Sequence, residues 1–191
     1  MADKGSHALP ETVFQAPGVQ LYGDIRFAAG VSVWPNAVMR AESHYIEIGS
    51  FSNVQDFAMI HVGGAASIIG DYCSITHHST VHGATIGNNC LLGIGVTIMD
   101  GAVIGDNSIV AGHTIVSEGS RIPANSVVAG VPGKVVAQRN NYVSNKLNAM
   151  AYHENALAYA KGHHRRWSDP DYAGLMATWK TQFEQEIEAS A

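Results

Sequence analysis

The chain has 191 residues, of which 46% are hydrophobic and 14% are charged, and its formal net charge is -5. This length and apolar content suffice for one domain with a hydrophobic core, while the acidic balance argues against nucleic acid or a membrane surface as a partner. No apolar run is long enough to span a membrane and the first residues lack the apolar region of a secretory signal, so we expect a cytoplasmic protein.

Along the chain, residues 1–18 are expected to form an N-terminal arm, and residues 19–136 carry a six-residue repeat. A repeat this short cannot bury its own apolar face, so its copies must stack on one another. The residue two positions before each repeated aliphatic is small in nearly every copy, as a narrow prism of short parallel strands requires. The regular aliphatic positions are Ile86, Leu92, Ile98, Ile104, Val110, Val116, Ile122 and Val128.

This pattern resembles the hexapeptide-repeat proteins, whose fold is a left-handed parallel β-helix. Glycine and asparagine gather between the repeats, where the chain must turn and positive φ is convenient. The resemblance covers residues 19 to about 136 and implies about six coils. We therefore expect a mainly β protein, a left-handed parallel β-helix followed by two C-terminal α-helices.

The composition changes after residue 136, and two segments have apolar residues spaced for one face of a helix. Residues 137–161 are predicted to hold a packing helix, and residues 162–191 a linker and a second helix. The predicted apolar stripe of the first helix is Leu147, Met150, Ala151, Leu157 and Ala158. That of the second helix is Leu175, Trp179, Phe183 and Ile187.

Three histidines lie just before the regular repeats. Ile60 and Val81 occupy equivalent positions in adjacent coils, so His61 and His82 should project outward from one face about one strand spacing apart, ~4.8 Å. His77 should project near a different edge, where it cannot easily reach the other two unless a neighbouring prism supplies it around a threefold axis. Three imidazoles with one open position are typical of a catalytic zinc site. The alternative is three unrelated surface histidines.

The segments 53–56, 60–62 and 77–83 are similar to the gamma-class carbonic anhydrase family. The resemblance implies a homotrimer in which His61 and His82 of one subunit and His77 of the next bind zinc, or iron or cobalt. It implies reversible hydration of CO2 to bicarbonate by a hydroxide on that metal. Within the site, Gln55 would orient the hydroxide and Asn53 would lie beside CO2.

The resemblance also assigns residues outside the histidine motif. It implies that Arg40 and Asp56 form an ion pair that helps to join subunits, and that Tyr152 reaches toward the active site. The family commonly has aspartate where this chain has Glu42 and glycine where it has His78. His78 could crowd the site, accept a proton near neutral pH, or face solvent, which we favour.

Other functions fit the same scaffold, because a fold does not determine a function. Hexapeptide-repeat proteins are often acyltransferases, and residues 129–136 resemble the end of their coil domain. The site could therefore serve acyl transfer from acyl-CoA or hydrolysis of a thioester. A third hypothesis is a catalytically weak trimer that binds metal structurally, since residues 62–66 carry no acidic group to take up the proton released by CO2 hydration.

Overall fold

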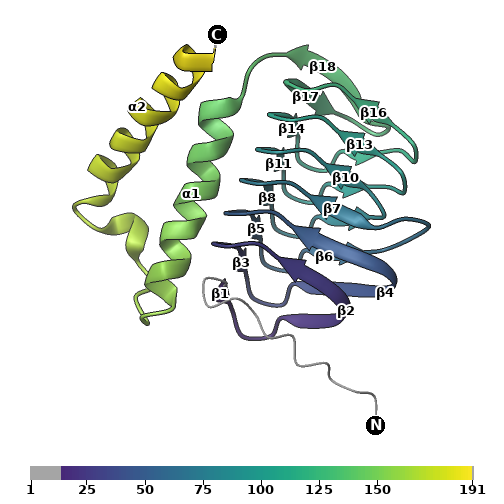
Figure 1. The fold of residues 1–191 in the computed structure, drawn as a ribbon, viewed down its shortest axis with the longest axis horizontal. Coiled ribbons are helices and arrows are strands. Elements are labelled where there is room, and N and C mark those ends of the chain that lie inside the picture. Colours follow the sequence, from purple (N-terminus) through teal and green to yellow (C-terminus); the bar gives the residue numbers. More distant parts are fainter. Residues whose placement is uncertain (1–13, 191) are drawn as a thin grey trace.

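A computed structural model of the chain describes residues 14–190, so residues 1–13 of the expected N-terminal arm lie outside the described residues. The strands stack as a parallel solenoid of about six turns, one helix lies against one side of it, and a second helix lies on the outer side of the first (Figure 1). The predicted mainly β fold, a β-helix followed by two C-terminal helices, is therefore confirmed.

The coils form a prism with three faces, here named A, B and C. Face A contains β1 (Phe14–Gln15), β3 (Ser32–Val33), β5 (Asn53–Val54), β8 (Ser74–Ile75), β11 (Leu91–Leu92), β14 (Ile109–Val110), β17 (Ser126–Ala129) and the antiparallel β18 (Lys134–Gln138). Face B contains β6 (Met59–His61), β9 (Thr80–His82), β12 (Thr97–Ile98) and β15 (Ile115–Val116). Face C contains β7 (Ser67–Ile69), β10 (Thr85–Ile86), β13 (Val103–Ile104) and β16 (Arg121–Ile122).

Two long strands, β2 (Gln20–Phe27) and β4 (Val38–Ile48), bend across faces B and C. The first part of β4 pairs with β6 on face B, and its last part pairs with β7 on face C. The core lies inside the prism, where the repeated aliphatic residues of adjacent coils stack. Ile98 pairs in register with Val81 and Val116, and all three are fully buried.

The inward small positions include the two cysteines. Cys73 and Cys90 are both free and fully buried, in adjacent coils of the same edge. Burial raises the pKa of the Cys73 thiol well above its ordinary value, and a hydrogen bond with Cys90 acts in the same direction. These thiols therefore serve as small hydrophobic groups of the core.

Helix α1 (Tyr142–Tyr159) covers face A, and a short 3-10 turn (Arg166–Ser168) leads into α2 (Tyr172–Ser190). The predicted apolar stripe of the first helix is wrong at Leu157, which is 46% exposed, whereas Ala158 is buried and the other three residues are partly buried. The buried residues of α1 are Asn145, Ala149, Asn155, Ala156 and Ala158. Asparagine is needed there because the helix lies on backbone carbonyls of the coil, and the Asn145 amide donates to those of Asn89 and Ser108.

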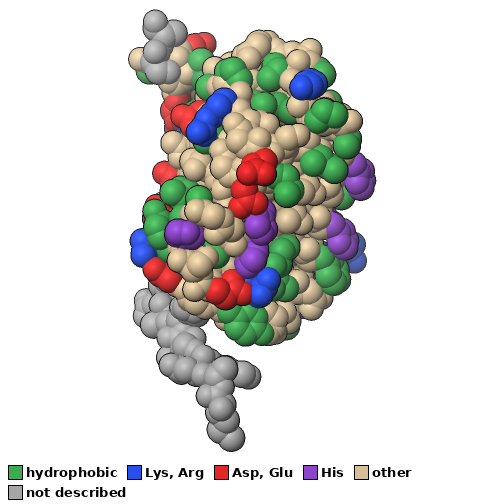
Figure 2. Space-filling view, turned by 90° about the vertical axis from the view of Figure 1, so that its right-hand side faces the viewer, with side chains coloured by type: hydrophobic (Ala, Val, Ile, Leu, Met, Phe, Trp, Pro, Cys, Tyr) green, Lys and Arg blue, Asp and Glu red, His purple; other side chains and the backbone are tan. Residues whose placement is uncertain are grey.

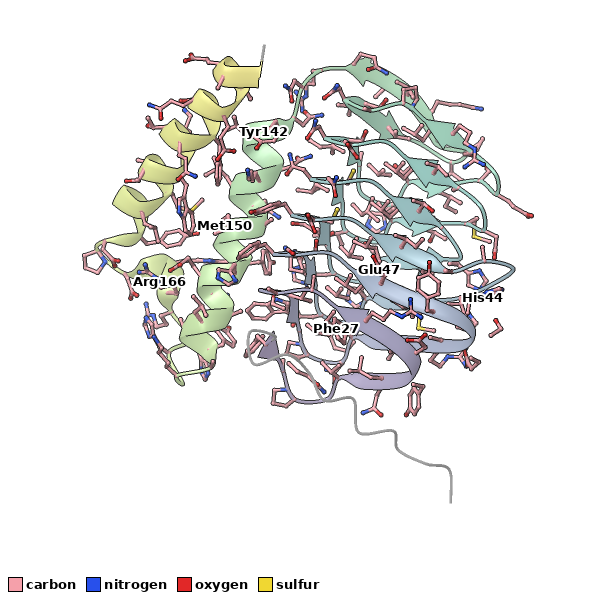
Figure 3. All side chains as sticks on the ribbon, viewed as in Figure 1. Phe27, His44, Glu47, Tyr142, Met150 and Arg166 are labelled. Atoms are coloured by element: carbon pink, nitrogen blue, oxygen red, sulfur yellow. The ribbon has the colours of Figure 1, made fainter. Side chains whose placement is uncertain are left out.

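Helix α2 docks on α1 through a polar clip of three side chains. Tyr142 and Lys146 of α1 each donate to Glu186 Oε2, over 2.6 and 2.7 Å, and Tyr142 lies at the end of α1 where the coil connects to it (Figure 3). The predicted stripe of α2 contributes Phe183, which is 4% exposed, under the Lys146 ammonium. Within residues 14–190, neither helix is long and apolar enough to cross a membrane.

Candidate metal centre

His61 and His82 end neighbouring strands of face B and are direct register partners. Ile60 and Val81, which precede them, point into the core and are fully buried. Alternation along a strand therefore turns both imidazoles outward, as the register predicts. The two rings meet with His61 Nδ1 and His82 Nε2 only 3.0 Å apart.

A carboxylate holds the other nitrogen of each ring. Glu42 Oε2 lies 3.0 Å from His61 Nε2, and Asp100 Oδ2 lies 2.6 Å from His82 Nδ1. Arg40 donates to the second oxygen of Glu42 over 2.5 Å. These contacts make one polar chain on the surface of the prism, and Figure 2 shows acidic, basic and histidine side chains gathered in a column on this side of the molecule.

Both carboxylates are expected to be ionised at neutral pH. Desolvation raises the pKa of Asp100, but the hydrogen bond and charge of His82 outweigh it, so the pKa lies below its ordinary value. Desolvation likewise raises the pKa of Glu42, whereas hydrogen bonds from its own backbone and from His61 bring the pKa below its ordinary value. An ionised carboxylate only accepts hydrogen bonds, so the facing ring nitrogens must carry the protons.

The two nitrogens that face each other are His61 Nδ1 and His82 Nε2. When both rings are neutral, each has one N–H, and His61 Nδ1 and His82 Nε2 then present lone pairs to one another. Two facing lone pairs repel each other, and either a proton shared between the two nitrogens or a metal ion bound by both removes that repulsion. Two nitrogens bound to tetrahedral zinc at ~2.1 Å would be ~3.4 Å apart, close to the observed separation. The pair therefore fits two adjacent ligands of a metal ion.

His61 and His82 supply only two of the ligands that a metal ion needs. Among residues 14–190, no group of three or more His, Cys, Asp or Glu side chains is arranged to hold a metal ion. His77 lies at the corner after β8, where its Nδ1 is 3.0 Å from Asp56 Oδ2 and its Nε2 is 3.4 Å from the Tyr152 hydroxyl. Burial, and then the charge of Asp56, raise the pKa of Tyr152 to about 12, so this hydroxyl remains a donor.

Gln55 and Asn53 form a third group, beside face A and under α1. Both are 1% exposed. Gln55 Nε2 donates to Asn53 Oδ1 over 2.9 Å, and the Asn53 amide donates to Ser74 Oγ over 3.0 Å. Asn148 of α1 donates to the same hydroxyl over 2.8 Å, which ties the helix to this polar row.

Three other predicted residues, Arg40, Asp56 and His78, have partners nearby in the same chain. Within the described chain, Arg40 pairs with Glu42 and Asp56 with His77, so the predicted Arg40–Asp56 pair between subunits stays a prediction. His78 is exposed and stacks flat on Phe57, with ring centroids 5.0 Å apart.

The contacts at Asp100 were not predicted from the sequence. Thr80 is in register with Thr97, so Asp100 lies one position beyond the partner of His82. Counting along face B to the next coil could have indicated it. Glu42 was noticed only as a departure from a family pattern, and the structure shows that its longer side chain reaches His61.

Curated proteins similar in sequence to this chain identify its family. A relative described as a probable carbonic anhydrase from Methanocaldococcus jannaschii is 46% identical over 147 residues, which is 76% of this chain and 89% of the relative. The chain belongs to the gamma carbonic anhydrase-like family of hexapeptide-repeat proteins. Gamma carbonic anhydrase 2, mitochondrial, of Arabidopsis thaliana is 32% identical, over 50% of this chain and 37% of that relative.

Other comparisons within the hexapeptide-repeat proteins are less specific. The family model described as bacterial transferase hexapeptide (six repeats) matches residues 83–118. The crystal structure of a putative acetyltransferase from Bacillus cereus has a TM-score of 0.77 and 28% identity, covering 80% of this chain and 90% of that one. The chain is thus a member of the gamma carbonic anhydrase-like family and is also similar in fold to a putative acetyltransferase.

Proposed function

We propose that this chain acts in the cytoplasm as a metal-dependent enzyme of the gamma carbonic anhydrase type, at a site shared between subunits of a homotrimer. The reaction adds water to CO2 to yield bicarbonate and a proton. The observation that carries the proposal is the pair of imidazole nitrogens 3.0 Å apart whose outer nitrogens are both held by carboxylates. Such carboxylates are typical outer-shell partners of metal-binding histidines.

His61 and His82 would hold the metal from one chain, and His77 of the partner subunit would complete the set. Asp56 supports that role, because it accepts from His77 Nδ1 and so leaves the lone pair on Nε2. The Tyr152 hydroxyl, 3.4 Å from Nε2 in the single chain, would give up this contact when a metal binds. Zinc is the proposed cofactor, with iron or cobalt equally suited to three imidazoles, and a metal bound there would lower the pKa of water to about 7.

The remaining predicted residues position the reactants in this proposal. Gln55 orients the attacking oxygen and Asn53 lies beside CO2, and their mutual hydrogen bond holds both amides in place. Tyr152 would reach toward the active site beside His77, with its hydroxyl kept neutral by the raised pKa. Arg40 and Asp56 would also join subunits, and His78 is available as a proton acceptor because its ring is exposed.

The test is a stopped-flow CO2 hydration assay on anaerobically purified, metal-quantified protein. We expect about one transition metal per subunit, and loss of both metal and activity in His82→Ala. His44→Ala is the matched control, because His44 is an exposed histidine of β4 at the edge of the prism farthest from the helices (Figure 3). Wild-type protein that binds no transition metal would contradict the proposal.

A second candidate is acyl transfer from acyl-CoA or thioester hydrolysis. Its support is the likeness to the putative acetyltransferase from Bacillus cereus. Release of free CoA from acyl-CoA, followed with a thiol reagent, measures it directly. Metal-replete protein that releases CoA and does not hydrate CO2 would favour this candidate, and metal-replete protein inactive in both assays would indicate a catalytically weak metal-binding trimer.

A further inference from the structure

Asp100 is held from two sides in the orientation that serves His82. Its Oδ2 accepts a hydrogen bond from His82 Nδ1 over 2.6 Å, and its Oδ1 accepts one from the backbone N–H of Gly64 over 3.3 Å. Rotating the carboxylate would break one of these two bonds. Since Nδ1 of His82 keeps its proton there, Nε2 is left as the lone pair that faces His61.

Room for this carboxylate depends on the absence of a side chain at Gly63. A Cβ at that position would lie 1.7 Å from Asp100 Oδ1 and 2.8 Å from His82 Cε1. Gly63 is not among the glycines with positive φ, so the position requires space and not an unusual backbone. At the next residue, Gly64, a Cβ would meet nothing within 4 Å, so this position has room for a side chain.

We infer that Asp100 is a positioning residue that fixes the tautomer and orientation of His82, and that Gly63 is glycine to admit the Asp100 carboxylate. The inference rests on the proposed function, since the nitrogen that Asp100 orients is the one proposed to bind metal. Loss of such a carboxylate typically weakens metal binding about 10–100-fold. Asp100 itself touches neither substrate nor metal in this arrangement.

The first test uses metal-free, full-length protein and nitrogen-15 NMR of the imidazoles at a pH where they are neutral. We expect His82 to be protonated on Nδ1 in the wild type and to lose that preference in Asp100→Ala, because the tautomer follows the hydrogen bond that the ring makes. A wild-type His82 protonated on Nε2, or the same tautomer in both proteins, would overturn the inference. This measurement does not depend on whether metal binds.

The second test is titration with cobalt(II), followed by its visible absorption. Asp100→Ala and Gly63→Ala should each bind cobalt about 10–100-fold more weakly, and Asp100→Asn should lose less because its amide oxygen can still accept from Nδ1–H. Gly64→Ala is the matched control and should stay within about threefold of the wild type, because alanine keeps the backbone N–H that donates to Asp100 and its Cβ would meet nothing within 4 Å. Equal affinity in Asp100→Ala and wild type, or equal losses in Gly63→Ala and Gly64→Ala, would contradict the inference. If the wild type binds no cobalt, the proposed function fails. The nitrogen-15 NMR measurement of the His82 tautomer still tests the role of Asp100 in that case.

Discussion

Replacing Glu186 by glutamine should loosen the docking of α2 in a pH-dependent way. Hydrogen bonds from Lys146 and then from Tyr142 lower the pKa of Glu186 from 4.5 to about 2. At about 1.36 kcal/mol per pKa unit this difference corresponds to ~3.4 kcal/mol. The Glu186 side chain is 35% exposed, however, and solvent screening reduces such an interaction to about 1 kcal/mol.

The sign of the pH dependence follows from the lowered pKa. Between pH 4.5 and 2 the unfolded chain binds a proton at Glu186 that the folded chain excludes, so stability increases with pH across this window. The contribution of Glu186 is complete above pH 4.5 and is lost as the pH falls toward 2. Glu186→Gln should therefore differ most from the wild type at neutral pH and converge with it in acid.

Urea unfolding at pH 7, 5 and 3 measures this, at one protomer concentration because assembly makes apparent stability depend on concentration. Glu184→Gln is the matched control on the same helix, since its nearest cation, Lys180, is 3.8 Å away and both side chains are largely exposed. That control should change stability by less than about 0.5 kcal/mol. Equal effects of the two substitutions at pH 7, or a Glu186→Gln effect that does not diminish toward pH 3, would refute the reasoning.

Three further predictions concern the core, a thiol and the ring beside His77. Ile98→Ala should lower the free energy of unfolding by about 2–5 kcal/mol, because it leaves a cavity in a fully buried stack. Thr97→Ala, on the outward side of the same strand, should lower it by less than about 1 kcal/mol. Similar losses for the two variants in urea unfolding would contradict this prediction. Cys73 should react with a thiol reagent only after denaturation, because its thiol is buried and its pKa is raised, and rapid labelling of the native protein would show otherwise. Tyr152→Phe removes a single long hydrogen bond of 3.4 Å, so cobalt affinity should change less than about threefold, and a tenfold loss would give the hydroxyl a larger role.

The fold could be predicted from the sequence because the repeat is local and repeated many times. Each aliphatic such as Ile98 needs only its neighbours one coil away, so the period alone indicates which side chains point inward. The stacking of His61 on His82 follows from the same register. Pattern and structure agree wherever alternation along a strand decides the direction of a side chain.

Other parts of the structure depend on groups that no apolar pattern records. Helix α1 packs on backbone carbonyls, so its buried face includes amide donors such as Asn145, which apolar spacing does not indicate. Asp100 reaches His82 diagonally, one position off the register, and depends on the space left at Gly63. These contacts are set by three-dimensional distances between coils, which the period does not contain.

The strand that turns back at the last coil has a consequence for association between molecules. A parallel solenoid ends in unpaired backbone groups, which invite another chain to continue the sheet. Here β18 runs antiparallel along β17 and occupies that edge of face A. At the end of face B, the backbone N–H of Ile115 donates to the carbonyl of Gly130 over 3.2 Å, and the N–H of Gly133 donates to the carbonyl of Ile115 over 2.7 Å. Faces A and B are thus covered at this end of the rod, which disfavours addition of another chain there, and β16 remains the edge strand of face C.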